Sequence, residues 1–269
     1  MMKTWTGQGW RDFQDGDLRP DDRGFLLGDG VFETLRVKGG TLRRGDLHRV
    51  RFEAACRAMD LDCPARWEAI AEGAETAGED AMVRVTLSRG AGPRGLGVIE
   101  APRPGLFLSA SPVSEPPDGL ALVTAPLRRS PSSLASRHKT LSYTDNAAAR
   151  RAAVRAGGDM ALCLTTQGHV SGGDCANIFW ICGSELVTPS PDCAIRTGVT
   201  REAVMKCAAD AGLSVREGMF SPDALQAAEA IFVTNCALGV VPVRSLDGLE
   251  FDVRHGAVQA LKRAEVIVG

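Results

Sequence analysis

The sequence predicts a mixed α/β protein, of the α/β or α+β class, built in two parts. Stretches with alternating apolar and polar residues, typical of strands, are interleaved with stretches of helical periodicity. The segment from Ser111 to Gly119 is punctuated by proline and indicates the end of a first domain or a linker. A chain of 269 residues is also long enough for two cores. We therefore expect one domain over residues 1–115 and a second over residues 120–269.

The first third is predicted to be β-rich. Residues 30–37 alternate like a half-buried strand, residues 38–40 supply a hairpin turn, and a return strand starts at Thr41. A helix is expected from about Asp46 to Met59, with Asp46 as the N-cap. The remaining elements expected in this third are a helix over 65–76, a strand over 82–88, a glycine-rich loop over 89–95 and a strand over 105–110.

The second half alternates helices and strands with a different rhythm. A helix is predicted to begin at Thr200, as its N-cap, and to run to Gly212, and another opens at Ser221 with a proline at its first position. The other expected elements are helices over 147–156 and 253–266 and strands over 160–165, 177–182, 185–187 and 230–234.

Composition excludes several classes of function. The 31 Lys and Arg nearly balance the 33 Asp and Glu, and basic runs are short, which argues against a nucleic-acid partner. No apolar run approaches the roughly 20 residues that cross a bilayer, and the start lacks the apolar core of a signal peptide. Eight scattered cysteines without a C-x-x-C pair argue against a metal site or a disulfide framework. We expect a soluble cytoplasmic protein with a small-molecule partner.

One lysine stands out as a candidate catalytic group. Lys139 lies in the polar segment Arg137–Asn146, beside Arg137 and His138 and just before an alanine-rich helix. A partly desolvated lysine near other cations can lose its proton near neutral pH and form an imine with a carbonyl compound. The alternative is a solvated surface charge, which is what most lysines are.

Two further segments are suited to phosphate. Residues 197–201 lie where a loop enters a helix, and unpaired N–H groups there attract anions, although a capped helix after a glycine turn explains them equally. Arg51 lies three residues after His48 on one helix face and either holds a phosphate through two hydrogen bonds or is a solvated charge. A polar loop over 234–239 gives a weaker signal of the same kind.

Taken together, these segments resemble the class IV, or fold type IV, family of pyridoxal-phosphate enzymes, over nearly the whole chain. The similarity lies in five stretches in the family's order: Asp22–Arg36 with His48-x-x-Arg51, Arg137–Asn146, Gly168–Trp180, Gly198–Arg201 and Val233–Val243. The resemblance implies a smaller N-terminal α/β domain, a larger barrel-like C-terminal α/β domain, pyridoxal 5'-phosphate as cofactor, and a homodimer.

The resemblance also implies roles for individual residues. Lys139 would form the imine with the cofactor and then shuttle the proton. The cofactor phosphate would be held by Arg51, Val199, Thr200, Asn235 and Cys236. The family normally places a glutamate five residues before Asn177 to keep the pyridine nitrogen protonated, but here that position is Gly172. Asp174 would point to the same side if the segment is extended, and is the candidate surrogate. Otherwise water or a neutral donor meets the nitrogen, the enzyme is slow, or activity is lost.

Three activities share this scaffold: branched-chain aminotransferase, D-amino acid aminotransferase and 4-amino-4-deoxychorismate lyase, which forms 4-aminobenzoate for folate biosynthesis and pyruvate. The loop Arg89–Leu96 ends in leucine where D-amino acid enzymes have histidine. Thr34 and Cys236 differ from the residues usual in branched-chain enzymes. The loop resembles that of the lyases, and Arg89 and Arg94 are its candidate substrate-binding residues. A lyase is the preferred interpretation, an aminotransferase the alternative, and a non-catalytic binding protein the third.

Overall fold

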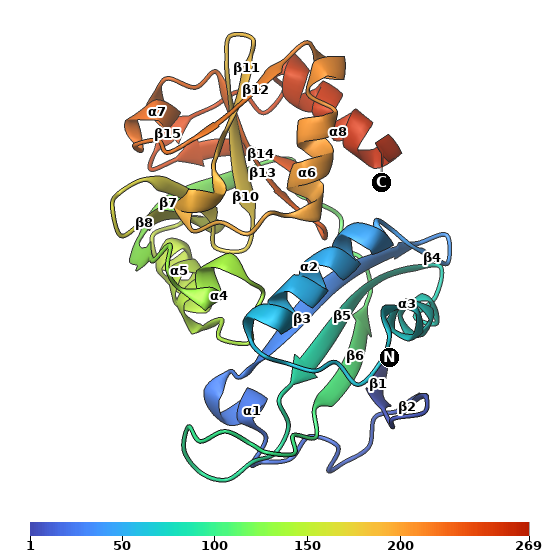
Figure 1. Cartoon of the computed structure of the whole chain (residues 1–269). Helices are drawn as coiled ribbons and strands as arrows, with labels where there is room; N and C mark the ends of the chain where they lie inside the picture. The colour runs from blue at the N-terminus through green and yellow to red at the C-terminus, as the bar shows by residue number, and fades with distance from the viewer. Residues whose placement is uncertain (269) are drawn as a thin grey trace. The chain divides into compact units, whose positions relative to one another are not determined.

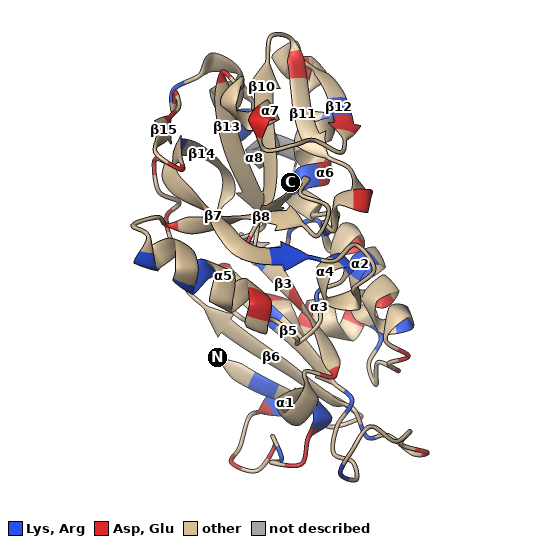
Figure 2. Cartoon of the chain, turned by 90° about the vertical axis from the view of Figure 1, so that its left-hand side faces the viewer, with Lys and Arg blue, Asp and Glu red and all other residues tan. Residues whose placement is uncertain are grey.

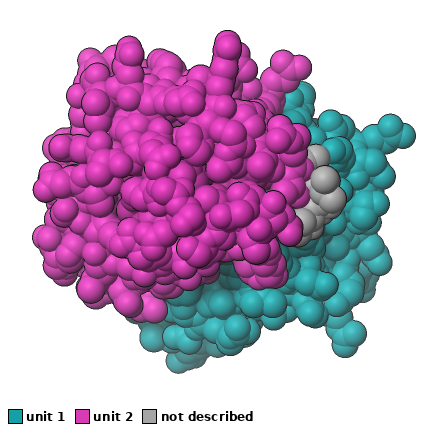
Figure 3. All heavy atoms as spheres, turned by 90° about the horizontal axis from the view of Figure 1, so that it is seen from above, with its two compact units in different colours: residues 1–113, 138–143 teal, residues 114–137, 144–269 magenta. Residues whose placement is uncertain are grey.

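The computed structural model describes residues 1–268, with side chains through residue 264. The mixed α/β class is confirmed, and the chain divides into two compact units (Figure 3). Unit 1 comprises Met1–Val113 and His138–Tyr143, and unit 2 comprises Ser114–Arg137 and Thr144–Gly269. In the view of Figure 2, the segments coloured for acidic and for basic residues are interspersed along the ribbon, in keeping with the nearly balanced charge. No helix of residues 1–268 has the length and apolar character of a membrane span.

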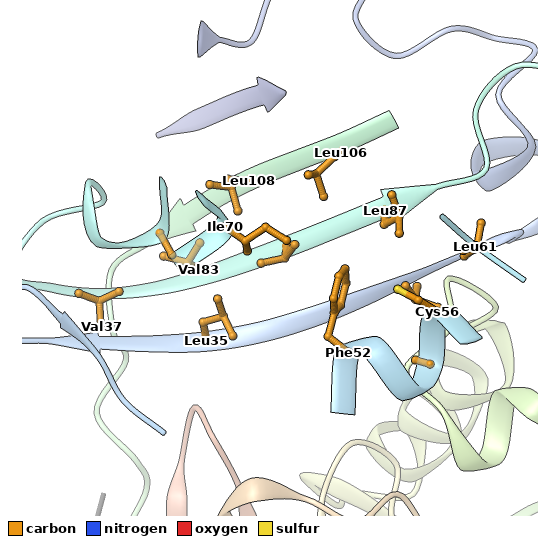
Figure 4. Packing of buried hydrophobic residues seen from close by; sticks show 14 of the residues in the cluster. Leu35, Val37, Phe52, Cys56, Leu61, Ile70, Val83, Leu87, Leu106 and Leu108 are labelled. Carbon is orange, nitrogen blue, oxygen red and sulfur yellow. The ribbon is translucent and has the colours of Figure 1, made fainter. Parts of the chain in front are cut away.

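Unit 1 is an antiparallel sheet in the order β2-β1-β6-β5-β3-β4 (Figure 1). Its strands are β1 (Met2–Trp5), β2 (Trp10–Asp12), β3 (Gly30–Lys38), β4 (Thr41–Leu42), β5 (Asp80–Ser88) and β6 (Gly105–Ser111), and its helices are α1 (Arg23–Leu27), α2 (Gly45–Ala58) and α3 (Trp67–Glu75). Figure 4 shows Phe52 of α2 and Ile70 of α3 packed against side chains of the strands, such as Leu35 and Val83. Alternation along β3 therefore sends one set of side chains into this core and the other to the opposite face.

The expected strand over 30–37 and the helix after it are present, but the predicted N-cap is wrong. Helix α2 begins at Gly45, and the residue before it, Arg44, has a left-handed φ of 53° and makes no side-chain capping bond. Asp46 lies inside the first turn, where its carboxylate faces the positive end of the helix dipole. The short strands β1 and β2 were not predicted.

Residues 138–143 are joined to β3 by backbone hydrogen bonds. The N–H of Phe32 donates to the carbonyl of Lys139 at 2.8 Å, and the N–H of Leu141 donates to the carbonyl of Gly30 at 2.8 Å. These bonds explain why the lysine segment belongs to unit 1 although both of its flanks belong to unit 2. The domain ranges 1–115 and 120–269 stay a prediction, and the compact units differ from them in this segment.

Unit 2 is a curled mixed sheet in the order β12-β11-β10-β13-β14-β7-β8-β9, with β15 paired to β14, in which β9 also approaches β10 and β11. Its strands are β7 (Leu120–Arg129), β8 (Met160–Thr165), β9 (Val170–Gly173), β10 (Asn177–Cys182), β11 (Glu185–Pro189), β12 (Ser214–Gly218), β13 (Ala230–Asn235), β14 (Gly239–Leu246) and β15 (Leu249–Glu250). Its helices are α4 (Leu134–Arg137), α5 (Thr144–Arg155), α6 (Val199–Lys206), α7 (Asp223–Gln226) and α8 (Gly256–Val268). Small side chains of α5 pack on β7 and β8, and α6 and α8 cover a second core.

Helix α6 differs from its prediction at both ends. Gly198, rather than Thr200, is the N-cap, so Thr200 lies in the first turn. The helix ends at Lys206, and a separate 3-10 turn, Ala209–Ala211, follows. Gly212 closes this turn with a left-handed φ of 73°, a conformation that glycine adopts without strain.

Candidate active site

In unit 1, Lys139 stands over an aromatic pair. Its Nζ lies 4.2 Å from the centroid of the Phe32 ring and 5.9 Å from that of Tyr143, and the two rings meet edge to face at 5.0 Å. A cation over an aromatic face is attracted by the ring quadrupole. No acidic side chain among residues 1–264 forms an ion pair with Lys139. The amine is thus held in place without being tied to a carboxylate, as a nucleophilic amine requires.

Arg84 also contacts the ring of Phe32, and the sequence did not predict it as a site residue. Its guanidinium carbon lies 3.7 Å from the centroid of Phe32, and its Nε donates to Thr86 at 3.2 Å. Arg84 is the cross-strand partner of Thr34, which lies on the same face of β3 as Phe32. The alternation of residues 82–88 places Arg84 on the polar face of a strand, but it does not show which residue of another strand lies beside it.

The opposite face of β3 carries a buried charge cluster of Glu33, His48 and Arg51. Arg51 donates from Nε to Glu33 Oε2 at 2.8 Å and from Nη2 to Glu33 Oε1 at 2.5 Å. His48 Nδ1 lies 3.5 Å from Glu33 Oε1 and 3.4 Å from Arg51 Nη2. The side chain of Glu33 is 1% exposed, that of His48 2% and that of Arg51 17%. Arg51 is therefore neither a simple surface charge nor an isolated one.

The cluster has a defined charge state at neutral pH. Burial acts to raise the pKa of Glu33, but the charge of Arg51 and the hydrogen bonds from His48 and Arg51 outweigh it and hold that pKa well below the usual range. Burial lowers the pKa of His48, an effect that the neighbouring Glu33 only partly offsets. The glutamate is therefore ionised and the histidine neutral.

Each side-chain nitrogen of Arg89 donates a hydrogen bond to another residue of unit 1. Nε donates to Asp29 at 2.8 Å, Nη1 to the carbonyl of Asp60 at 2.8 Å and Nη2 to the carbonyl of Met59 at 2.5 Å. These bonds tie the end of β5 to the end of α2. Arg94 lies on an exposed loop. Substrate binding by either arginine stays a prediction, and for Arg89 it would require these bonds to break.

In unit 2, the N-terminus of α6 is shaped for an anion. The N–H groups of Val199 and Thr200 lie in the first turn, where a helix offers no acceptor. A Cβ at Gly198 would lie 2.4 Å from Asn177 Oδ1, so a larger residue there would displace the Asn177 amide. The Thr200 hydroxyl is buried without a hydrogen-bond partner, as is that of Thr234, the cross-strand neighbour of Asn177. Buried hydroxyls normally have partners, so this region fits a group such as a phosphate that supplies acceptors.

The loop after β13 is stabilised by Asn235. Its Oδ1 accepts hydrogen bonds from the N–H groups of Ala237 and Leu238 at 3.0 and 2.8 Å, and its Nδ2 donates to the carbonyl of Cys175 at 3.4 Å. The amide therefore builds the turn into β14. Contacts of Asn235 and Cys236 with a phosphate stay predictions.

Asp174 already has strong partners. Arg150 donates to its two oxygens at 2.7 Å each, and the N–H of Ala161 donates to Oδ2 at 2.8 Å. A contact with a pyridine nitrogen would compete with these bonds, so the structure favours a structural role. At Gly172, a Cβ would lie 2.8 Å from the carbonyl oxygen of Ala176, and the backbone there leaves no room for the family's glutamate. Among the described residues no three His, Cys, Asp or Glu are grouped to hold a metal ion.

Comparison with known proteins places these features in a family. Residues 30–246 match the model of the amino-transferase class IV family. A protein of Methanocaldococcus jannaschii, provisionally named a branched-chain-amino-acid aminotransferase, is 32% identical over 92% of this chain and 88% of its own length. The aminodeoxychorismate lyase of Bacillus subtilis is 28% identical over 94% and 91%. The crystal structure of 4-amino-4-deoxychorismate lyase from Pseudomonas aeruginosa superimposes with a TM-score of 0.84 at 28% identity, covering 97% of each chain.

Proposed function

The chain belongs to the amino-transferase class IV family, and we propose that within it the protein acts as a 4-amino-4-deoxychorismate lyase that releases 4-aminobenzoate and pyruvate. It is an enzyme that depends on pyridoxal 5'-phosphate, as this family does. The cofactor supplies an aldehyde that bonds to the substrate amine and a ring that takes up electrons. The chain itself must bind the phosphate, orient the amine and move a proton.

Lys139 would hold the cofactor covalently and would move the proton. The position of its Nζ over Phe32, without an acidic partner, supports both tasks, because the same nitrogen must attack a carbonyl and later accept and return a proton. Phe32 and Tyr143 form the apolar surface against which the amine works.

The phosphate would be held by Arg51 and by the N–H groups of Val199 and Thr200, with the loop at Asn235 and Cys236 as an additional contact. Three observations support this assignment: the clamped guanidinium of Arg51, the glycine N-cap of α6 and the unpartnered hydroxyl of Thr200. A guanidinium and a helix N-terminus both suit a phosphate dianion.

The absence of a carboxylate at residue 172 is a departure from the pattern of the whole family, and the preference for a lyase rests instead on the loop Arg89–Leu96 and on the lyase relatives. In the family pattern a glutamate there strengthens the ring as an electron acceptor, and here the backbone of Ala176 fills its place while Asp174 is bound to Arg150. A ring without that partner is a weaker electron acceptor in either reaction.

Substrate carboxylates require a cation beside the reacting amine. We assign this role to Arg84, which is exposed and lies on the same ring as Lys139. A guanidinium pairs with a carboxylate through two hydrogen bonds. Arg94, on its exposed loop, is the second candidate. The protein is further proposed to be a cytoplasmic homodimer that serves folate biosynthesis.

A product assay tests the proposal directly. The cofactor-loaded protein is incubated with aminodeoxychorismate, and 4-aminobenzoate and pyruvate are measured; a lyase forms them in equal amounts. Parallel reactions with pairs of amino acids and oxo acids test the aminotransferase alternative, which predicts new amino acids instead. Neither product, with the cofactor still bound, would favour the non-catalytic binding protein. Lys139→Ala is the control for product that forms without the enzyme.

A further inference from the structure

We propose that Glu33 is a positioning residue that fixes the guanidinium of Arg51 in advance for the cofactor phosphate, an inference that rests on the phosphate-binding role proposed above for Arg51. Glu33 lies on β3, on the face that points into the core of unit 1, between Val31 and Leu35. An ionised carboxylate in such a place is unfavourable unless it is paired. A buried carboxylate among apolar neighbours therefore indicates a specific role for Glu33.

The geometry of the pair defines the task. Glu33 receives hydrogen bonds from Nε and from Nη2, which lie along one edge of the planar guanidinium. This edge therefore points at the carboxylate, and Nη1 points away from it. The N–H of Thr34 donates to Glu33 Oε1 at 2.9 Å and fixes the carboxylate in turn. The remaining edge of Arg51 is thereby aimed in one direction, before any ligand arrives.

His48 limits the movement of the pair without adding charge. Its ring nitrogen lies within 3.5 Å of both partners, and burial lowers its pKa, so it stays neutral at neutral pH. A protonated histidine would compete with Arg51 for Glu33. The neutral ring leaves the glutamate to a single cation.

Two effects of Glu33 on phosphate binding oppose each other. Its negative charge partly cancels that of Arg51 and so weakens the attraction for a phosphate, whereas its two hydrogen bonds hold a long, flexible side chain in one rotamer and so strengthen binding. The position of the pair in the core favours the second effect, because a carboxylate that served only to balance charge would not need both oxygens on one arginine edge. The sign of the change on removing the carboxylate therefore decides the proposal.

Equilibrium binding of pyridoxal 5'-phosphate and of pyridoxal, which lacks the phosphate, to the full chain separates the possibilities. Visible absorbance gives the dissociation constant of each compound for the wild type, Arg51→Ala, Glu33→Gln and the double variant. We expect Glu33→Gln to weaken binding of the phosphate compound about 10-fold, and binding of pyridoxal less than about 2-fold. In the Arg51→Ala background, Glu33→Gln should add no further loss, because the positioned group is gone.

Several results would overturn the role of Glu33: tighter binding of the phosphate compound, an equal loss for both compounds, or an additive loss in the double variant. If Arg51→Ala itself leaves phosphate binding unchanged, the phosphate role of Arg51 fails first and this inference fails with it. Weaker binding in Arg51→Ala together with unchanged binding in Glu33→Gln would refute the role of Glu33 alone.

Two further variants guard against misfolding. Glu33→Asp keeps the charge but draws the carboxylate back by one methylene, so it should also weaken binding of the phosphate compound selectively. The ³¹P resonance of the bound pyridoxal 5'-phosphate should shift in this variant. Asp80→Asn removes the partner of Arg36 at the other end of β3, where an Asp80 oxygen lies 2.6 Å from Arg36 Nη2. This matched control should bind both compounds like the wild type, and a selective loss in it would show that any arginine–carboxylate pair on β3 has the same effect.

Discussion

Lys139 and Phe32 are joined twice: the ammonium nitrogen lies 4.2 Å from the centre of the phenyl ring, and the N–H of Phe32 donates to the carbonyl of Lys139 at 2.8 Å. The backbone bond fixes where the lysine leaves the chain, and the ring fixes where its side chain ends. With its backbone and its side-chain nitrogen both held by Phe32, Lys139 keeps its position without an ion pair.

Lys139→Ala should abolish turnover and the visible absorbance of the bound cofactor, and Lys139→Arg should do the same, since arginine keeps its proton and cannot act as the amine nucleophile. Lys38→Ala, at the exposed end of β3, is the matched control and should retain both properties. Borohydride followed by peptide mapping should label Lys139. Product formation by the alanine variant at the wild-type rate would contradict the assignment.

Arg51→Ala should weaken cofactor binding by about 1.5–3 kcal/mol, the scale of a lost hydrogen bond to a charged group. The structure adds a second consequence that helical periodicity did not predict, because the variant leaves Glu33 buried without its cation. Stability should therefore fall, by about 3–5 kcal/mol if the carboxylate stays charged. Urea unfolding of the cofactor-free protein measures this loss. Glu33→Gln in the same chain should restore part of it, and an unchanged unfolding midpoint in Arg51→Ala would argue against the buried pair.

His48 should make the protein less stable in mild acid. Its pKa is lowered on folding, so below the ordinary value of 6.5 the unfolded chain takes up a proton that the folded chain refuses. The free energy of unfolding should thus decrease as the pH falls from about 7 towards 5. The pKa of Glu33 is also lowered, but its contribution is lost only below the ordinary value of 4.5, so the two windows are separate.

Denaturant titrations at several pH values test this assignment. His48→Asn should flatten the dependence in the window above pH 5. An equally steep pH dependence in His48→Asn would assign the effect to another group.

Asp174→Asn should act on stability rather than on chemistry. The carboxylate accepts two bonds from Arg150 and one from Ala161, so we expect a loss of about 1.5–3 kcal/mol in unfolding free energy, with little change in the rate at which substrate Cα–H bonds break. Deuterium exchange at that carbon, measured in cofactor-loaded protein, gives the rate. A large selective loss of exchange would return Asp174 to the role of ring-nitrogen partner.

Gly172→Glu should destabilise the protein instead of improving it. The new Cβ would meet the carbonyl oxygen of Ala176 at 2.8 Å, and overpacking of this kind costs about 1–3 kcal/mol. Gly172→Ala isolates the steric part. Gly256→Ala is the control, because a Cβ there meets no atom within 4 Å. Faster lyase turnover in Gly172→Glu, at wild-type stability, would mean that the backbone relaxes to readmit the carboxylate.

Elements with a strong local signal could be predicted from the sequence, and contacts across the chain could not. The alternation of residues 30–37 placed β3 because neighbouring residues specify it. The same pattern counts Glu33 as a polar residue on a strand and does not show that it pairs with Arg51, eighteen positions away. The cap at Asp46 was wrong because the left-handed turn at Arg44 has no distinctive sequence. Arg84 was overlooked because its partner, Phe32, lies on another strand.

The attachment of residues 138–143 to β3 also bears on how the protein is synthesised and cut. The chain passes from unit 1 to unit 2, returns for six residues and leaves again. On the ribosome, unit 1 therefore cannot be completed when residue 113 emerges, and its last pieces arrive only with Tyr143. A protease that cleaves in residues 114–137 should leave two fragments that remain associated, because Phe32 and Leu141 keep their backbone bonds across the nick. A recombinant fragment that stops at residue 113 would lack the edge partner of Gly30 and Phe32 and the lysine with it.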